Sequence, residues 1–426
     1  MKSSTVTPLR PLFPAGSERH SPRARRFHVM AKPCGSACNL ACTYCYYLHK
    51  ETLLQHVPAG RMREATLERF IRQYIEGNDG ESVVFSWQGG EPTLLGMDFF
   101  VTALRLQKKY ARPGAVIANT LQTNGTLLTD EWASFLKEHD FLVGLSVDGP
   151  EDLHDMHRRD KAGGPTFHRV MEGHGHLRRH GVPFTVLTTV NRHNAKRPLD
   201  VYRFLTRELG ADYVQFNPCV EPVSFEHTAP HFWDEASLPR SGTPRARPGR
   251  KQSVVTEWSV DADDWGAFLC AVFDEWLERD LGRVLVNWFE TAVAQTMQLP
   301  AQICMTGEIC GKGVALEHTG HVYSCDHYVY PEYRLGHIDD HSLSDLVFSE
   351  RQKTFGFDKR NTLPRQCLHC PHGLLCWGQC PRHRLLKTAD GEAGLNYLCS
   401  GLKKFYSHSK AAVRSIAAQC LDARGR

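Results

Sequence analysis

Short apolar runs alternate with longer amphipathic stretches through the first half of the chain. The apolar runs are rich in β-branched and aromatic residues and predict strands near Phe27–Lys32 and at Val83–Trp87, Val116–Gln122, Phe141–Val147, Phe184–Val190 and Tyr213–Asn217. The stretches between them predict helices at Glu64–Glu76, Asp98–Tyr110, Asp130–His139, Thr166–His180 and Pro198–Leu209. Strands and helices that alternate at this spacing favour an α/β fold with a parallel sheet and right-handed crossovers.

The second half of the chain has a less regular pattern. Residues from Glu221 to Ser253 are rich in Pro, Arg, His and Ser and predict a loop or insertion, whereas Trp265–Leu281 has the pattern of an amphipathic helix. We predict six parts: a disordered basic tail (1–26), an α/β domain (27–220), an insertion or linker (221–258), a helical connector (259–298), a cysteine-rich domain (299–406) and a C-terminal helix (407–426).

Composition narrows the class of protein. The 426 residues are 41% hydrophobic and 23% charged, and the net charge of +4 is too small to indicate a nucleic-acid-binding protein. Much of the positive excess lies in the N-terminal tail, at Arg10, Arg19, Arg23, Arg25 and Arg26. This predicts a disordered extension, with a targeting or polyanion-binding arm as the alternative. No apolar run is long enough to span a membrane, and residues 1–26 lack the apolar core of a secretion signal. We therefore expect a cytoplasmic protein without membrane or nucleic-acid partners.

Fifteen cysteines in a cytoplasmic chain are not expected to form a disulfide framework, and their clustering indicates metal binding. The first group is Cys38-x3-Cys42-x2-Cys45. Three thiolates can hold three corners of an iron–sulfur cube, leaving the fourth iron open to a small chelating molecule. A structural zinc loop or buried cysteines without a metal are the alternatives, and Cys34 and His49 are near enough to complicate the ligand count.

The second group supplies eight thiols, enough for two complete four-cysteine clusters, with two zinc ribbons as the alternative. It runs Cys304-x5-Cys310-x14-Cys325, then Cys367-x2-Cys370-x5-Cys376-x3-Cys380, and ends at Cys399. The remaining cysteines are interpreted as ordinary thiols: Cys34, Cys219, Cys270 and Cys420.

The first cysteine loop, with Tyr44 before its last thiol, resembles the radical S-adenosylmethionine (SAM) signature. The turn Ser86-Trp-Gln-Gly89-Gly90-Glu91-Pro92 after the second predicted strand resembles the GGEP motif of the same family. The resemblance implies a partial (β/α)6 barrel in which the open iron chelates SAM. It also implies a set of SAM-binding residues: Tyr44, Gly89, Gly90, Glu91, Ser146 near the ribose or carboxylate, and Arg158 on the carboxylate.

The second cysteine array resembles the SPASM extension, including Gly320 five residues before Cys325. That resemblance implies two auxiliary clusters, so the chain would hold three 4Fe-4S clusters. Its implied ligands are Cys304, Cys310, Cys325 and Cys380 for auxiliary cluster I, and Cys367, Cys370, Cys376 and Cys399 for auxiliary cluster II.

Further segments resemble the anaerobic sulfatase-maturating enzymes between Phe27 and Ser407, apart from the insertion. They are Lys32-Pro-x-Gly35-x-x-Cys38-Asn-Leu, Ser86–Leu94, Val190–Asn194, Leu316-Glu-His318, Tyr323–Tyr330 and Gly394–Cys399. The resemblance implies oxidation of a Cys or Ser in a sulfatase segment C/S-x-P/A-x-R to Cα-formylglycine, with electrons from a reductant such as flavodoxin or ferredoxin.

Within that resemblance, Asp326 is implied as the base that takes the substrate proton, because it directly follows Cys325. The alternative is a carboxylate that only hydrogen-bonds the cluster loop. Other functions remain open at this point: a SPASM enzyme that crosslinks a ribosomal peptide through thioether or carbon–carbon bonds, an enzyme acting on a small alcohol, a ferredoxin-like carrier, or a zinc-stapled binding module.

Overall fold

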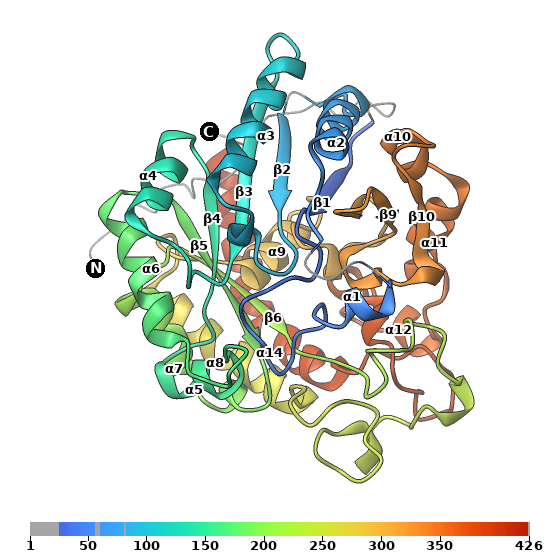
Figure 1. Cartoon of the computed structure of the whole chain (residues 1–426). Coiled ribbons are helices and arrows are strands. Elements are labelled where there is room, and N and C mark those ends of the chain that lie inside the picture. The colour runs from blue at the N-terminus through green and yellow to red at the C-terminus, as the bar shows by residue number, and fades with distance from the viewer. Residues whose placement is uncertain (1–24, 56–59, 81, 425–426) are drawn as a thin grey trace.

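The fold is built around one large, mostly parallel sheet, seen in a computed structural model that describes residues 25–55, 60–80 and 82–424. Within these residues the sheet has ten strands in the order β10-β9-β8-β1-β2-β3-β4-β5-β6-β7 (Figure 1). Their bounds are β1 His28–Lys32, β2 Ser82–Trp87, β3 Val116–Thr123, β4 Leu142–Ser146, β5 Phe184–Val190, β6 Tyr213–Pro218, β7 Leu285–Val286, β8 Gly313–Glu317, β9 His321–Tyr323 and β10 Arg334–His337. Strands β1 to β8 pair in parallel, and β9 and β10 continue the sheet in antiparallel pairing.

Helices lie around the outside of the curved sheet and bury its outer face (Figure 1). In the barrel region they are α1 Lys50–Leu53, α2 Glu64–Gly77, α3 Met97–Tyr110, α4 Asp130–Glu138, α5 Glu151–His157, α6 Phe167–Arg179 and α7 Pro198–Arg203. Further along are α8 Ala262–Arg279, α9 Asn287–Thr296, α10 Leu343–Val347, α11 Glu350–Asn361, α12 Arg365–Leu368, α13 Gly373–Cys376 and α14 Cys399–Arg424. Phe70 and Tyr74 of α2, for example, pack on Phe85 and Trp87 of β2.

The predicted strands and barrel helices are confirmed with small shifts at their ends. One predicted helix, Pro198–Leu209, is divided into α7 and a short π-helix at Phe204–Glu208. The predicted tail 1–26 lies outside the described residues except for Arg25 and Arg26. The six-part division of the chain stays a prediction.

The C-terminal helix begins at Cys399, earlier than the predicted 407. Gly401 weakens the helical pattern at this point, because glycine has low helix propensity. The structure needs this glycine: a Cβ atom there would lie 1.9 Å from the Ala262 carbonyl oxygen, where α14 crosses α8.

The cysteine-rich half joins the barrel sheet directly. Strand β8 pairs with β1 along its whole length, from His28 opposite Gly313 to Lys32 opposite Glu317. The β8–β9–β10 ribbon thereby covers the open edge of β1, and β10 and β7 become the outer strands of the sheet. The pairing also brings Asp326, which follows β9, close to the end of β1.

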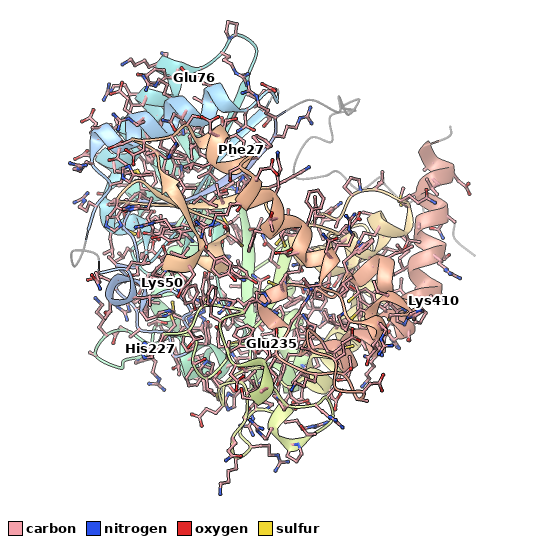
Figure 2. All side chains as sticks on the ribbon, turned by 90° about the vertical axis from the view of Figure 1, so that its right-hand side faces the viewer. Phe27, Lys50, Glu76, His227, Glu235 and Lys410 are labelled. Carbon is pink, nitrogen blue, oxygen red and sulfur yellow. The ribbon has the colours of Figure 1, made fainter. Side chains whose placement is uncertain are left out.

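The predicted irregular segment 221–258 has two 3-10 turns, at Glu235–Ser237 and Pro244–Ala246, and is tied to the cysteine-rich half. Glu221 forms an ion pair with Arg382, and both side chains are buried. The Tyr333 hydroxyl donates to the Pro230 carbonyl oxygen at 2.7 Å. Figure 2 labels His227 and Glu235 on this segment.

In the described part of the chain, no helix combines the length and apolar character needed to cross a membrane.

Candidate active site

The first cysteine loop follows β1 at the edge where the parallel strands end. The backbone N–H of Leu40 lies 3.3 Å from Sγ of Cys38, and Nδ2 of Asn124, just after β3, lies 3.8 Å from the same sulfur. The loop is anchored to the end of α5, because the Thr43 N–H donates to the His157 carbonyl oxygen at 3.0 Å. The structure therefore holds this loop against neighbouring strand ends, with N–H donors directed at a sulfur atom.

The three thiols of the loop interact with one another. Burial raises the pKa of Cys42 to about 12; Arg158 opposes this shift, and the Cys45 and Cys38 thiolates add to it. Burial is also the main cause that raises the pKa of Cys38 to about 12. Thiolates so enclosed need positive charge close by, and metal ligation supplies it. The donor set therefore fits an iron–sulfur cluster with three protein ligands.

The glycine pair after β2 packs on the backbone of the cysteine loop. The Gly90 N–H donates to the Gly35 carbonyl oxygen at 2.8 Å, and the Glu91 N–H donates to that of Ala37 at 2.8 Å. A Cβ atom on Gly90 would lie 1.9 Å from the Ala37 carbonyl oxygen. Glycine is required here because two backbone segments meet without room for a side chain.

We expect Gly90→Ala to displace the cysteine loop and prevent cluster assembly there. Anaerobically reconstituted variant should hold about eight irons per chain instead of about twelve, since one of three cubes is lost. Iron and sulfide assays measure this. The matched control is Gly175→Ala in α6, where the nearest atom to the new Cβ is the flexible end of Arg179 at 3.4 Å. Equal iron content in both variants would contradict the expectation.

Glu91 is fully buried, and its carboxylate is satisfied within the protein. One oxygen accepts from the Thr93 N–H at 3.1 Å, the Thr93 hydroxyl at 2.7 Å and the Thr123 hydroxyl at 2.8 Å, and the other accepts from the Asn124 N–H at 2.7 Å. The side chain thus fastens the turn after β2 to the end of β3. A direct contact between Glu91 and SAM stays a prediction.

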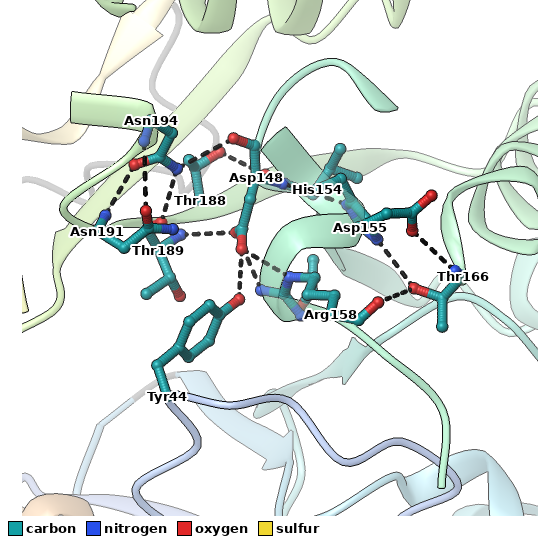
Figure 3. Close-up of polar contacts among 12 residues, drawn as sticks. Tyr44, Asp148, His154, Asp155, Arg158, Thr166, Thr188, Thr189, Asn191 and Asn194 are labelled. Atoms are coloured by element: carbon teal, nitrogen blue, oxygen red, sulfur yellow. Dashed lines mark hydrogen bonds and ion pairs between the residues drawn. The ribbon is translucent and has the colours of Figure 1, made fainter. Parts of the chain in front are cut away.

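Tyr44 and Arg158 meet on Asp148, a residue to which the sequence pattern assigned no role (Figure 3). The Tyr44 hydroxyl donates to Asp148, and Nε of Arg158 lies 3.1 Å from Oδ2 of Asp148. The Thr189 N–H donates to Oδ1 of the same carboxylate at 3.0 Å. The buried Asp148 carboxylate therefore orients Arg158. Arg158 also lies beside the cysteine loop, because its charge opposes the rise of the pKa of Cys42.

Ser146 ends β4 at the same edge. Its hydroxyl accepts from Nε2 of Gln122 at 3.0 Å. The residues that the resemblance implied for SAM therefore come from the ends of β2 and β4, the cysteine loop and α5, and they gather at one edge of the sheet. Their contacts with SAM stay predictions.

Asp326 lies between the barrel and the cysteine-rich half. The Lys32 ammonium, at the end of β1, forms an ion pair with one carboxylate oxygen, and the Tyr46 hydroxyl donates to the other. Burial raises the pKa of Asp326, but Lys32, His327 and Tyr46 together lower it to about 2. The carboxylate is ionised at neutral pH, and it touches the segment of the first cysteine loop while following Cys325 in the chain.

Four thiols of the second array converge as the resemblance implied for auxiliary cluster I. Burial raises the pKa of Cys310 to about 12; Lys359 opposes this, and Cys380 and Cys304 add to it. Burial also raises the pKa of Cys325, with further contributions from Cys304 and Cys380. The fully buried Lys359 side chain donates to the Cys304 and Met305 carbonyl oxygens at 2.8 Å. Burial lowers the pKa of Lys359, and the neighbouring thiolates of Cys310, Cys380 and Cys304 oppose this shift.

The other four thiols line a cavity of about 320 Å³ near the surface, formed by α12, α13 and the start of α14. Burial raises the pKa of Cys376 to about 12, and Cys399, Cys367 and Cys370 add to the shift. The structure therefore brings together the set implied for auxiliary cluster II.

Among the described residues, no three Cys, His, Asp or Glu side chains meet as the ligands of one metal ion do. A cluster has a different geometry, because each thiolate binds its own iron.

Sequence reasoning missed three charged residues near these thiols: Lys32, Asp148 and Lys359. Lys32 begins one of the family-like segments at the end of β1, and Asp148 follows Ser146 by two residues just after β4, so in both places a charged residue at a strand end could have been singled out. Lys359 had no signal, because a lysine in the polar helix α11 resembles a solvent-exposed one.

Two sequence profiles of known families match the chain. The radical SAM superfamily profile matches residues 33–205, and that of the SPASM iron–sulfur cluster-binding domain matches residues 304–371. Together with the mostly parallel sheet and the grouped thiols, these matches define a radical SAM oxidoreductase with a SPASM domain. The predicted fold class is confirmed, although the SPASM match ends before Cys376, Cys380 and Cys399.

Relatives that align over most of the chain narrow the family. A serine-type anaerobic sulfatase-maturating enzyme of Bacteroides thetaiotaomicron is 42% identical over 91% of each chain. A cysteine-type anaerobic sulfatase-maturating enzyme of Clostridium perfringens is 32% identical over 91% of this chain and 98% of its own. The solved structure of native anSMEcpe with bound AdoMet and Cp18Cys peptide matches with a TM-score of 0.77 and 30% identity, over 92% of this chain and 99% of that one. The chain belongs to the family of anaerobic sulfatase-maturating enzymes.

Proposed function

We propose that the protein uses SAM and three 4Fe-4S clusters to oxidise one Cys or Ser in a C/S-x-P/A-x-R segment of a sulfatase to Cα-formylglycine. The observation that carries this proposal is the position of Asp326. It follows a ligand of one thiol set, Cys325, and its carboxylate is held by Lys32 and by Tyr46, which follows another ligand, Cys45. A base in this place can serve a substrate bound between the two clusters.

The first thiol set holds the SAM-binding cluster in this proposal, with Cys38, Cys42 and Cys45 as ligands. When bound, this cluster and SAM supply a 5′-deoxyadenosyl radical that removes a hydrogen atom from the substrate Cβ. Gly89, Gly90 and Ser146 provide backbone and hydroxyl groups toward SAM. Arg158, oriented by Asp148 and stacked near the Tyr44 ring at 5.6 Å, provides its remaining N–H groups to the SAM carboxylate.

Asp326 then takes the proton from the substrate Sγ or Oγ. The ion pair with Lys32 keeps the Asp326 carboxylate ionised, so that it can accept a proton. The incoming substrate thiol or hydroxyl replaces the Tyr46 hydroxyl as the hydrogen-bond donor to this carboxylate. An adjacent carbon radical makes that proton more acidic, so a base of low pKa is sufficient. The eight thiolates of the SPASM half would hold the two auxiliary clusters, which would accept the second electron of the oxidation. Serine gives the aldehyde directly, and cysteine gives a thioaldehyde that water hydrolyses with release of hydrogen sulfide.

The peptide substrate is supported by the relative whose structure contains a Cp18Cys peptide. Serine-type and cysteine-type relatives both align over most of the chain, so either residue is a candidate substrate. The reductant is proposed as a flavodoxin or ferredoxin.

The test uses anaerobically reconstituted protein, SAM, dithionite and matched Cys and Ser sulfatase peptides. The expected products are lighter by about 18 Da for Cys and about 2 Da for Ser, and both react with an aldehyde reagent. Iron should reach about twelve per chain. A product about 2 Da lighter that does not react as an aldehyde would indicate a crosslinking enzyme instead. Zinc in place of iron, or SAM cleavage with both peptides unchanged, would contradict the proposal.

A further inference from the structure

The thiols of the auxiliary cluster II set lie beneath an exposed apolar patch. Leu368 of α12 and Leu374 of α13 line the mouth of the cavity and are 63% and 75% exposed. Each stands within two residues of a cysteine of the set, Cys367 or Cys376. Leucines so exposed on short helices contribute little to the core, and their place over a redox site suggests a contact with another molecule.

A row of basic side chains runs from this patch along α14. Cys399, Lys403, Ser407, Lys410 and Arg414 recur at helical spacing, so they share one face, and the last four are exposed. Lys403 lines the cavity, and the Ser407 hydroxyl lies 3.0 Å from Nε2 of His372, which joins the helix to the cavity wall. Figure 2 labels Lys410 on this helix.

The surroundings of the row carry charges of both signs. Lys404 is exposed on the neighbouring face of α14, and Arg365 at the start of α12 is exposed and paired with Glu392. Asp263 and Asp274 of α8 bond to Ser400 and His408 on another face of α14. Between Cys399 and Arg424 the sequence contains a single acid, Asp422, far from the cavity. An acidic surface therefore complements this side of the molecule, whereas a second copy of the chain would present the same positive charge to it.

We propose that Leu368, Leu374, Lys403, Lys410 and Arg414 form a docking surface for a small acidic one-electron carrier protein. The inference rests on the proposed function, since it needs a cluster on the four thiolates. Transient redox complexes bury small interfaces, and charge complementarity around an apolar centre speeds their formation and permits rapid release. The carrier exchanges one electron at this surface: the cluster held by Cys367, Cys370, Cys376 and Cys399 loses it, and the oxidised carrier gains it.

The first test measures binding of purified flavodoxin to the oxidised holoenzyme by anaerobic biolayer interferometry. We expect the double variant Lys403→Glu, Lys410→Glu to raise Kd at least about tenfold at low salt, with the difference shrinking at high salt. Leu374→Asp should raise Kd by about fivefold or more. Matched controls are the double variant Lys108→Glu, Lys137→Glu on α3 and α4 and the single variant Val101→Asp on α3. They place the same changes on exposed residues away from the cavity and should change Kd by less than about twofold. Iron content confirms that every variant is loaded.

Several results would overturn the docking surface. The first is equal Kd values for the docking-surface variants and their matched controls. The second is that neither flavodoxin nor a bacterial ferredoxin binds to unaltered holoenzyme. The third is that a random-sequence DNA duplex binds more tightly than flavodoxin. Failure of the proposed function is seen separately, because dithionite-driven peptide oxidation needs no carrier. If the holoenzyme oxidises the peptide with dithionite and all variants bind flavodoxin with the same Kd, only the docking surface is overturned.

Discussion

We expect Cys38→Ala to abolish reductive cleavage of SAM, with a loss of at least about a thousandfold. The substitution removes one of three thiolates, and a cube with two protein ligands is not held. Iron should fall from about twelve to about eight per chain, because the other two thiol sets are separate. The measurements are 5′-deoxyadenosine by chromatography and iron by colorimetric assay.

The matched control for this prediction is Cys34→Ala. Cys34 is buried in the same loop, and Cys38 is close enough to add to the rise of the pKa of Cys34 that burial causes. If Cys34 is an ordinary thiol, its removal leaves SAM cleavage and iron content near those of the unaltered protein. Loss of a whole cluster in Cys34→Ala would show that the loop has a fourth ligand, and the open coordination position would have to be abandoned.

The second large effect is expected for Asp326→Asn. SAM cleavage should continue, while formation of the peptide aldehyde falls by about 10²–10⁴-fold, the usual contribution of a general base. An amide keeps the shape of the side chain and cannot take the substrate proton. Product peptide and 5′-deoxyadenosine are quantified in the same reaction, so that the two steps are compared directly. Equal loss of both would remove Asp326 from the role of base.

Two further variants distinguish the loss of the base from the loss of the ion pair with Lys32. Asp326→Asn leaves the buried Lys32 ammonium without its counter-charge, and breaking a buried pair costs about 3–5 kcal/mol. The double variant Lys32→Met, Asp326→Asn removes both charges and should recover thermal stability without recovering product. Asp340→Asn, an exposed acid beyond β10, should leave cleavage and product unchanged.

Much of the site could be predicted because its signals are local. Cys38, Cys42 and Cys45 lie within one loop, and Gly89-Gly90 stands in a turn whose strand is clear from its apolar pattern. The strand ends were predicted well for the same reason, since a strand of a parallel sheet is a short apolar run bounded by polar residues. The sequence predicted Gly90 only as a SAM-binding residue. In the structure a side chain is also excluded there, because Gly90 packs on the Ala37 carbonyl oxygen.

Other parts depend on contacts between distant residues. Spacing alone does not separate eight cysteines into two sets, and it was the family resemblance that joined Cys380 to Cys304 instead of to its neighbour Cys376. The ion pairs between Lys32 and Asp326 and between Glu221 and Arg382 join residues far apart in the sequence. A charged residue in such a pair has the same local pattern as one exposed to water, so no periodicity identifies it.

By itself, the sequence determined the alternating strands and helices, the three-cysteine loop, the glycine turn and the supply of eight further thiols, because each of these is encoded over a few neighbouring residues. Only the tertiary structure decided that β8 extends the barrel beside β1, that Asp148 orients Tyr44 and Arg158, and that Lys32 holds Asp326. The physical reason is that these contacts are stable only when the surrounding core excludes water, and that exclusion is a property of the whole fold.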